Sequence, residues 1–159
     1  EKICSAGGGE LTLCTQNIDD LHEQAGSRRV IHMHGELKKA RCHDCGDVSA
    51  ADGDLSVELG CAACGRVGGL RPHVVWFGEM LPPDVFDAAR NACRRCEVML
   101  VAGTSSVVQP AAPLAAWARA AGAAVIEINP EATPLTESAD ITIPGPSGTL
   151  LPAIVELLT

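Results

Sequence analysis

The sequence predicts an α/β protein with a Rossmann-like, doubly wound parallel sheet and a small inserted lobe that binds zinc through four cysteines. Two observations support this fold class. The pairs Cys42-x-x-Cys45 and Cys61-x-x-Cys64 are separated by fifteen residues, a spacing that lets four thiolates converge on one zinc ion. Beyond them, short and nearly continuous apolar runs alternate with helical segments, as is typical of a parallel sheet buried on both faces.

Composition narrows the class of protein. The chain has 159 residues, of which 47% are hydrophobic and 20% charged, as expected for a globular protein. Aromatic residues make up only 3%, so we expect a core of Val, Leu, Ile and Ala. The net charge of −8 argues against a nucleic-acid partner and mildly favours a basic one, such as a lysine-bearing substrate.

The cysteine count bears on the compartment. Eight cysteines without a signal peptide, four of them in metal-binding pairs, indicate a reducing, cytoplasmic location. No apolar run is long enough to span a bilayer, so we expect no membrane association.

The first elements are short. Residues 11–15 predict a strand, and Asp19-Asp20 can cap a short helix that ends at Gly26. A second apolar run, residues 30–33, leads to His34-Gly35.

The zinc-binding lobe is expected at residues 41–66. Four cysteines close the coordination sphere, so the metal should hold structure and not perform chemistry. His43 lies between two of these cysteines and could be miscounted as a ligand.

After the lobe the pattern becomes regular. We expect a strand or extended segment at 72–77, a helix from Pro82-Pro83-Asp84 to Cys93, and strands at 98–102, 124–128 and 141–143. Helices are expected at 110–121 and 150–158. Residues 11–40 and 67–159 would then form the Rossmann-like domain around the inserted lobe.

Small and polar residues follow three of the expected strands. They are Thr15-Gln16-Asn17-Ile18-Asp19, Gly103-Thr104-Ser105 and Asn129-Pro130-Glu131. Ligands of open parallel sheets bind beyond the carboxyl ends of the strands, and the 145–148 loop enters a helix whose N–H groups favour anions. Each segment alone could be an ordinary turn, but together they indicate a nucleotide site.

Two further features leave alternatives open. His32 and His34 would share one face of an extended segment, and only one is expected to act as a base. Cys93-x-x-Cys96 could be a redox pair, but its place at a helix end beside a buried strand favours core packing.

Several of these motifs occur together in one known family. In addition to the two CxxC pairs and the three strand-end segments, the chain carries His32-Met33-His34-Gly35-Glu36-Leu37 and Leu70-Arg71-Pro72-His73-Val74-Val75-Trp76-Phe77-Gly78-Glu79. In this order they resemble the sirtuins, NAD-dependent protein lysine deacylases. The His-Val-Val-Trp-Phe-Gly-Glu form is most similar to the bacterial and mitochondrial deacetylase/desuccinylase branch.

The resemblance implies a role for each motif. His34 would be the general base and Asn17 would lie with it in the reaction centre. Zinc would be held by Cys42, Cys45, Cys61 and Cys64. NAD would be contacted by Gln16, Asn17, Ile18, Asp19, Gly103, Thr104, Ser105, Asn129, Pro130, Glu131 and Ser147. The acyl-lysine peptide would be contacted by Val75, Trp76, Phe77, Gly78, Glu79 and Val108.

The implied reaction consumes NAD: the bond from ribose to nicotinamide breaks and the acyl group passes to ADP-ribose. Sirtuins carry a longer segment before Thr-Gln-Asn-Ile-Asp, with Gly-Ala-Gly-x-Ser and Gly-Ile-Pro-Asp-Phe-Arg motifs that this chain lacks. We therefore expect a fragment that binds NAD weakly. Alternatives are a non-catalytic zinc-stabilised binding module, and an NAD hydrolase or ADP-ribosyltransferase on the same scaffold.

Overall fold

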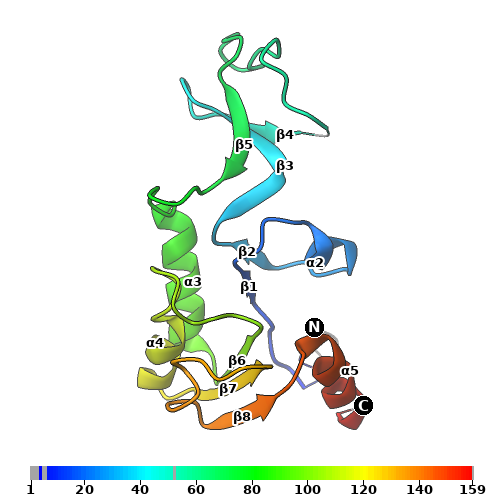
Figure 1. The fold of residues 1–159 in the computed structure, drawn as a ribbon, viewed down its shortest axis with the longest axis vertical. Helices are drawn as coiled ribbons and strands as arrows, with labels where there is room; N and C mark the ends of the chain where they lie inside the picture. The colour runs from blue at the N-terminus through cyan, green and yellow to red at the C-terminus, as the bar shows by residue number, and fades with distance from the viewer. Residues whose placement is uncertain (1–3, 5–6, 52, 159) are drawn as a thin grey trace. The chain divides into compact units, whose positions relative to one another are not determined.

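The computed structural model describes Cys4, residues 7–51 and residues 53–158. The elements are labelled in Figure 1. The chain divides into two units, one formed by Thr12–Val85 and the other by Phe86–Thr159 with the residues up to Leu11. Each unit is described by itself.

The unit from Thr12 begins with a pair of parallel strands. Strand β1 (Leu13–Thr15) pairs with β2 (Val30–His32), and the short helix α2 (Leu21–Gln24) connects them. Both strands lie in the segments that the sequence predicts. The predicted cap is present: the side chain of Asp19 accepts the N–H of Leu21 at 3.1 Å, and the helix ends at Gln24, two residues before Gly26.

An antiparallel sheet follows. Strand β3 (Gly35–Cys42) lies between β4 (Val48–Ala50) and β5 (Leu70–Val74). The extended segment expected at 72–77 is therefore displaced: the strand begins at Leu70 and ends at Val74, because β5 follows the register of β3, in which Leu70 faces Cys42. The sequence analysis did not predict this antiparallel sheet: β4 is a three-residue, exposed strand, and β5 is half-buried along its whole length.

The other unit holds a parallel sheet. Strands β6 (Val98–Ala102), β7 (Ala124–Asn129) and β8 (Ile141–Pro144) pair in that order, all parallel, with β7 in the centre (Figure 1). Helix α3 (Pro83–Arg95) precedes β6, α4 (Leu114–Ala120) contacts β6 and β7, and α5 (Ser147–Leu157) contacts β7. The three strands lie where the sequence predicts them.

The core of this sheet is aliphatic, as the composition predicts. Val101, Val125 and Leu135 pack with Ala115 of α4, and small alanines on α4 let the helix approach the strands closely.

Two predicted helices differ at their starts. Helix α4 begins at Leu114 and not at residue 110, because Pro113 lacks an N–H and disfavours a helical conformation in the residue before it. Helix α5 begins at Ser147, directly after the extended Pro146, and so is longer than the expected 150–158.

The predicted fold class is confirmed: parallel strands alternate with helices, and four cysteines cluster within the unit Thr12–Val85, as expected for a zinc site. Among the described residues, no helix has the length and apolar character needed to cross a membrane.

Candidate functional site

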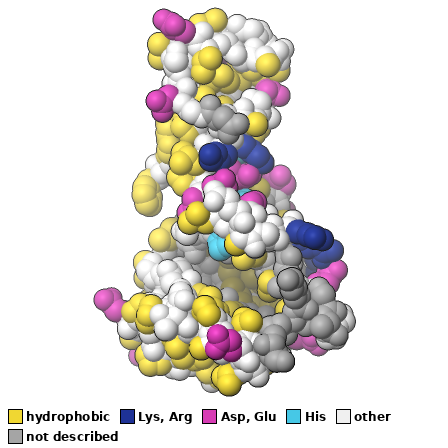
Figure 2. All heavy atoms as spheres, turned by 90° about the vertical axis from the view of Figure 1, so that its right-hand side faces the viewer, with side chains coloured by type: hydrophobic (Ala, Val, Ile, Leu, Met, Phe, Trp, Pro, Cys, Tyr) yellow, Lys and Arg dark blue, Asp and Glu magenta, His cyan; other side chains and the backbone are white. Residues whose placement is uncertain are grey.

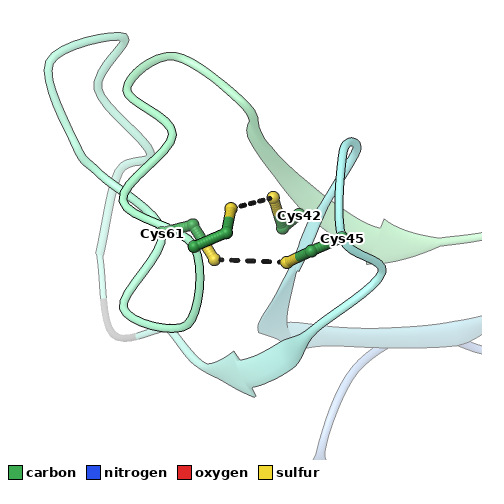
Figure 3. Close-up of side chains that lie close together, drawn as sticks. Cys42, Cys45 and Cys61 are labelled. Carbon is green, nitrogen blue, oxygen red and sulfur yellow. Dashed lines mark hydrogen bonds between the residues drawn. The ribbon is translucent and has the colours of Figure 1, made fainter.

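The candidate metal centre consists of the four predicted cysteines. The sulfurs of Cys42, Cys45, Cys61 and Cys64 all lie within 4.8 Å of one another. Cys42 Sγ is 3.7 Å from Cys64 Sγ, and Cys45 Sγ is 3.6 Å from Cys61 Sγ (Figure 3). Four sulfurs at zinc–sulfur distances of about 2.3 Å in a tetrahedron lie about 3.8 Å apart, so the cluster fits zinc.

The two knuckles are built in the same way. In each, the glycine after the second cysteine has a positive φ, +77° at Gly46 and +75° at Gly65, and its N–H returns to the carbonyl of the first cysteine. Only glycine adopts this conformation at little cost, so each turn aims two sulfurs inward. His43 is outside the cluster, and zinc would have four thiolate ligands.

The thiols of the cluster differ in acidity without metal. A hydrogen bond from the N–H of Cys45 lowers the pKa of Cys42 to about 7, whereas burial and the neighbouring thiols raise the pKa of Cys45 to about 12 and also raise that of Cys64, so zinc binding must displace protons. An ion pair between Arg66 Nε and Asp44 Oδ2, 3.0 Å apart, joins the two knuckles. Hydrophobic side chains, Val57, Leu59 and Val67 among them, lie on the surface of this lobe (Figure 2).

His34 lies against the end of β1. Its Nδ1 is 2.9 Å from the main-chain oxygen of Gln16, and the N–H of Val75 donates to the carbonyl of His34 at 2.9 Å. Because a carbonyl oxygen only accepts, Nδ1 carries a proton, and in the neutral imidazole the lone pair is then on Nε2. This tautomer is the one that a general base acting through Nε2 requires.

The segment after β1 is held in place by main-chain contacts. The buried Thr15 accepts the N–H of Asn17 through Oγ1 at 3.1 Å, and the N–H of Leu37 donates to the carbonyl of Ile18 at 2.8 Å. The structure thus brings residues 15–19 and His34 together. His32 is separate, since its Nε2 lies 2.8 Å from Glu23.

Gly35 allows this arrangement. Its φ is +83°, and a Cβ there would lie 2.1 Å from the carbonyl oxygen of His73. The residue after His34 must therefore be glycine for β3 and β5 to meet at this point.

The predicted peptide-contacting loop follows β5. Trp76 is 54% exposed and Phe77 is fully exposed, so both present apolar surface. The carboxylate of Glu79 accepts the N–H of Trp76 at 3.1 Å and two bonds from Arg71 at 2.7 and 3.0 Å. Val108, the remaining predicted contact residue, lies in the loop after β6 in the other unit, where its carbonyl accepts the N–H of Ala112.

The other predicted nucleotide-binding residues converge at one rim of the parallel sheet. Asn129 Nδ2 donates to the carbonyl of Thr104 at 2.7 Å, and a Cβ on Gly103 would lie 3.8 Å from Ser147 Oγ. The N–H of Glu131 lies 3.4 Å from Asn129 Oδ1. Helix α5 begins at this rim, so its first N–H groups add positive potential. Ser105 and Pro130 are exposed there.

Sequence reasoning missed a buried carboxylate beneath this rim. Glu127 on β7 is 3% exposed and accepts hydrogen bonds from the hydroxyls of Thr133 and Thr136. These contacts fix the loop that carries Pro130 and Glu131. A charged residue in an apolar strand, followed by two threonines three residues apart, was the available signal.

The third CxxC is not built like the zinc knuckles. Cys93 is buried on α3, and burial raises its pKa to about 11; the thiol of Cys96 donates to the carbonyl of Cys93 at 3.2 Å. Core packing is the interpretation that these contacts support, because a raised pKa disfavours the thiolate that redox chemistry needs.

Comparisons with known proteins agree with this arrangement. The model of the Sir2 family matches residues 3–110. An NAD-dependent protein deacylase of Caulobacter vibrioides is 50% identical over 151 residues, which cover 95% of this chain and 63% of that protein.

Two solved structures are similar as well. A Sir2 homologue in complex with NAD is 46% identical in sequence, with a TM-score of 0.88. The matched region covers 98% of this chain and 61% of the homologue. Sir2Af2 bound to a myristoylated histone peptide shares 36% identity at a TM-score of 0.79, with 97% and 67% covered. The chain therefore spans less than two thirds of the length of the first two relatives.

Proposed function

Because the chain belongs to the Sir2 family, we propose that it acts in NAD-dependent removal of acyl groups from lysine side chains of proteins. The observation that carries the proposal is the contact of His34 Nδ1 with the carbonyl of Gln16, which makes Nε2 the ring nitrogen that can accept a proton, beside the loop at Val75. The similar proteins support the choice of substrates, since one is a deacylase, one is solved with NAD and one with an acylated peptide.

In the proposed reaction NAD is a substrate. The bond between its ribose and nicotinamide breaks, positive charge develops at the ribose carbon, and the oxygen of the acyl group attacks there. Held in line with that carbon, a weak nucleophile reacts far faster than in solution. His34 Nε2 then accepts a proton from a ribose hydroxyl, a task suited to an imidazole near neutral pH.

We assign the remaining contacts by the same reasoning. Gln16, Asn17, Ile18 and Asp19 would meet the nicotinamide half of NAD, and the rim at Gly103, Asn129 and Ser147 would meet the adenosine half. Trp76 and Phe77 would cover the lysine stem and keep water away from the reacting carbon. Zinc on the four cysteines would stabilise the lobe and take no part in the chemistry.

We also propose a cytoplasmic location, because four thiolates that hold a metal need a compartment in which cysteines stay reduced.

Nicotinamide release tests the proposal. The zinc-loaded protein is incubated with NAD and an acetylated, a succinylated or an unmodified lysine peptide. Release that depends on an acylated peptide supports deacylation. Release without any peptide would instead indicate an NAD hydrolase. No release, together with NAD binding by calorimetry, would indicate a binding module.

A further inference from the structure

We propose that Arg71 is a positioning residue that holds the loop at Trp76 in the shape that receives the acyl-lysine. None of the roles assigned above includes Arg71. The inference rests on the proposed function for the identity of the ligand, but the contacts that carry it lie wholly within residues 69–79.

Arg71 makes three kinds of contact with the loop. Its Nη2 donates to both carboxylate oxygens of Glu79, at 2.7 and 3.0 Å. Its Nη1 donates to the carbonyl of Val74 at 3.3 Å. The guanidinium carbon lies 4.4 Å from the centre of the Trp76 ring, within the range of a cation–π contact. We call these three residues, Arg71, Trp76 and Glu79, the Arg71 clamp.

The clamp is closed by the main chain. Glu79 accepts the N–H of Trp76 through its carboxylate at 3.1 Å, and the N–H of Glu79 donates to the carbonyl of Trp76 at 2.9 Å. The carboxylate of Glu79 therefore accepts hydrogen bonds from the main chain of the turn and from Arg71 at the same time. The hydrogen bond from Arg71 also holds the pKa of Glu79 below its ordinary value, so the pair stays charged at neutral pH.

Burial separates this pair from an ordinary surface ion pair. The side chain of Arg71 is only 14% exposed and that of Glu79 is 35% exposed, whereas the Arg66 and Asp44 side chains are 65% and 48% exposed. In this partly buried pair one nitrogen of the guanidinium contacts both carboxylate oxygens and the other contacts the main chain, which fixes its geometry, while an exposed single contact contributes little.

The strand that carries Arg71 starts at the metal cluster. Leu70 faces the zinc ligand Cys42 across the sheet, and the N–H of His43 donates to the carbonyl of Gly69 at 2.7 Å. At the other end of β5, the N–H of Val75 reaches the carbonyl of His34. Strand β5 is thus fixed next to the zinc ligand Cys42 at its start. Arg71, on this strand, contacts the loop that lies beside His34.

The physical requirement is clear for Trp76 and Phe77. Both are large, exposed and apolar. The hydrophobic effect disfavours such exposure, so contacts that fix the backbone are needed to keep these side chains exposed. A loop already in its bound shape costs less to order when a peptide binds. Loss of the clamp should therefore weaken peptide binding and leave NAD binding unchanged.

The test compares Arg71→Lys and Glu79→Gln with Arg66→Lys, a matched control in the same unit. Lysine keeps the charge but has a single nitrogen, so it cannot contact Glu79 and the carbonyl of Val74 as the two guanidinium nitrogens do, and it lacks the flat group that lies over Trp76. In the clamp variants the KM for the acyl peptide is expected to rise about tenfold, with the KM for NAD unchanged. The Arg66 variant should match the wild type in both, and all three should retain zinc.

A second measurement needs no activity. In a Trp117→Phe background, Trp76 is the one remaining tryptophan, and acrylamide quenching reports its accessibility. Quenching should increase in both clamp variants and stay unchanged in the control. If Arg71→Lys loses zinc, Glu79→Gln decides, because Glu79 lies outside β5.

Two results would overturn the inference: unchanged quenching and peptide KM in both clamp variants, or equal increases in the KM for NAD and for peptide. If the wild-type protein shows no acyl-dependent nicotinamide release, the proposed function fails, and the quenching comparison alone decides the role of Arg71.

Discussion

The Nδ1 atom of His34 donates to the main-chain oxygen of Gln16 across 2.9 Å, and this single hydrogen bond selects the tautomer of the imidazole. The sequence places both residues next to predicted strands, but 18 positions separate them. Their contact follows from the parallel pairing of β1 with β2, in which Thr15 faces His32.

Replacing His34 by asparagine should remove the base and keep the hydrogen bond to Gln16, because the amide N–H can occupy the place of Nδ1–H. We expect steady-state formation of deacylated peptide to fall by about 10²–10⁴-fold, the usual contribution of a general base, because His34 acts after nicotinamide has left. Zinc content and the unfolding midpoint should not change. His22→Asn is the control and should retain full activity; a fully active His34→Asn protein would remove His34 from the reaction.

Gly35→Ala should destabilise the unit that contains it by about 2–5 kcal/mol, because the new methyl group would meet the carbonyl oxygen of His73 in a backbone conformation already strained for alanine. Gly26→Ala is the matched control: its φ is also positive, +91°, but nothing lies within 4 Å of the added Cβ. It should cost only about 1–2 kcal/mol. Urea unfolding of both proteins measures the difference, and equal losses would contradict the close approach.

Removal of zinc should unfold the lobe and not merely slow a reaction, since binding of a structural zinc supplies about 10–16 kcal/mol in small modules. Chelator titration followed by amide proton exchange should show loss of protection in β3, β4 and β5. Cys45→Ser should bind no zinc at stoichiometric concentration, and Cys96→Ser, outside the cluster, should bind one equivalent. An intact antiparallel sheet in the metal-free protein would disprove the assignment.

Cys93 should resist alkylation at pH 8, because burial raises its pKa to about 11 and leaves little thiolate. Iodoacetamide labelling with mass spectrometry should modify the exposed Cys14 first. In the unfolded chain the thiol has its ordinary, lower pKa and loses its proton at lower pH. Its contribution to the free energy of unfolding is therefore complete below that ordinary pKa and is lost as pH rises toward about 11. Rapid labelling of native Cys93 at pH 8 would show that the thiol is accessible.

Much of the fold was predictable because its signals are local. The run at 98–102 is apolar throughout and the run at 124–128 is apolar except for Glu127, and the structure makes β6 and β7 of them within one residue. The start of α4 was predicted at Pro110, but the helix begins at Leu114. A second proline, Pro113, disfavours a helical conformation in the residue before it. The antiparallel sheet around the cysteines escaped prediction because β4 has only three residues, all exposed, and because β3 pairs with β5, a segment far from it in the sequence.

The sequence by itself determined the zinc ligand set, the parallel strands and the family motifs, because each depends on spacings of a few residues that any local conformation preserves. Three contacts were decided only by the tertiary structure. Arg71 donates a hydrogen bond to Glu79, the carbonyl of His73 lies too close to Gly35 for any side chain there, and Glu127 is buried beneath the rim. Such contacts depend on strand register and on the path of loops, which are set when distant parts of the chain pack and which no local spacing encodes.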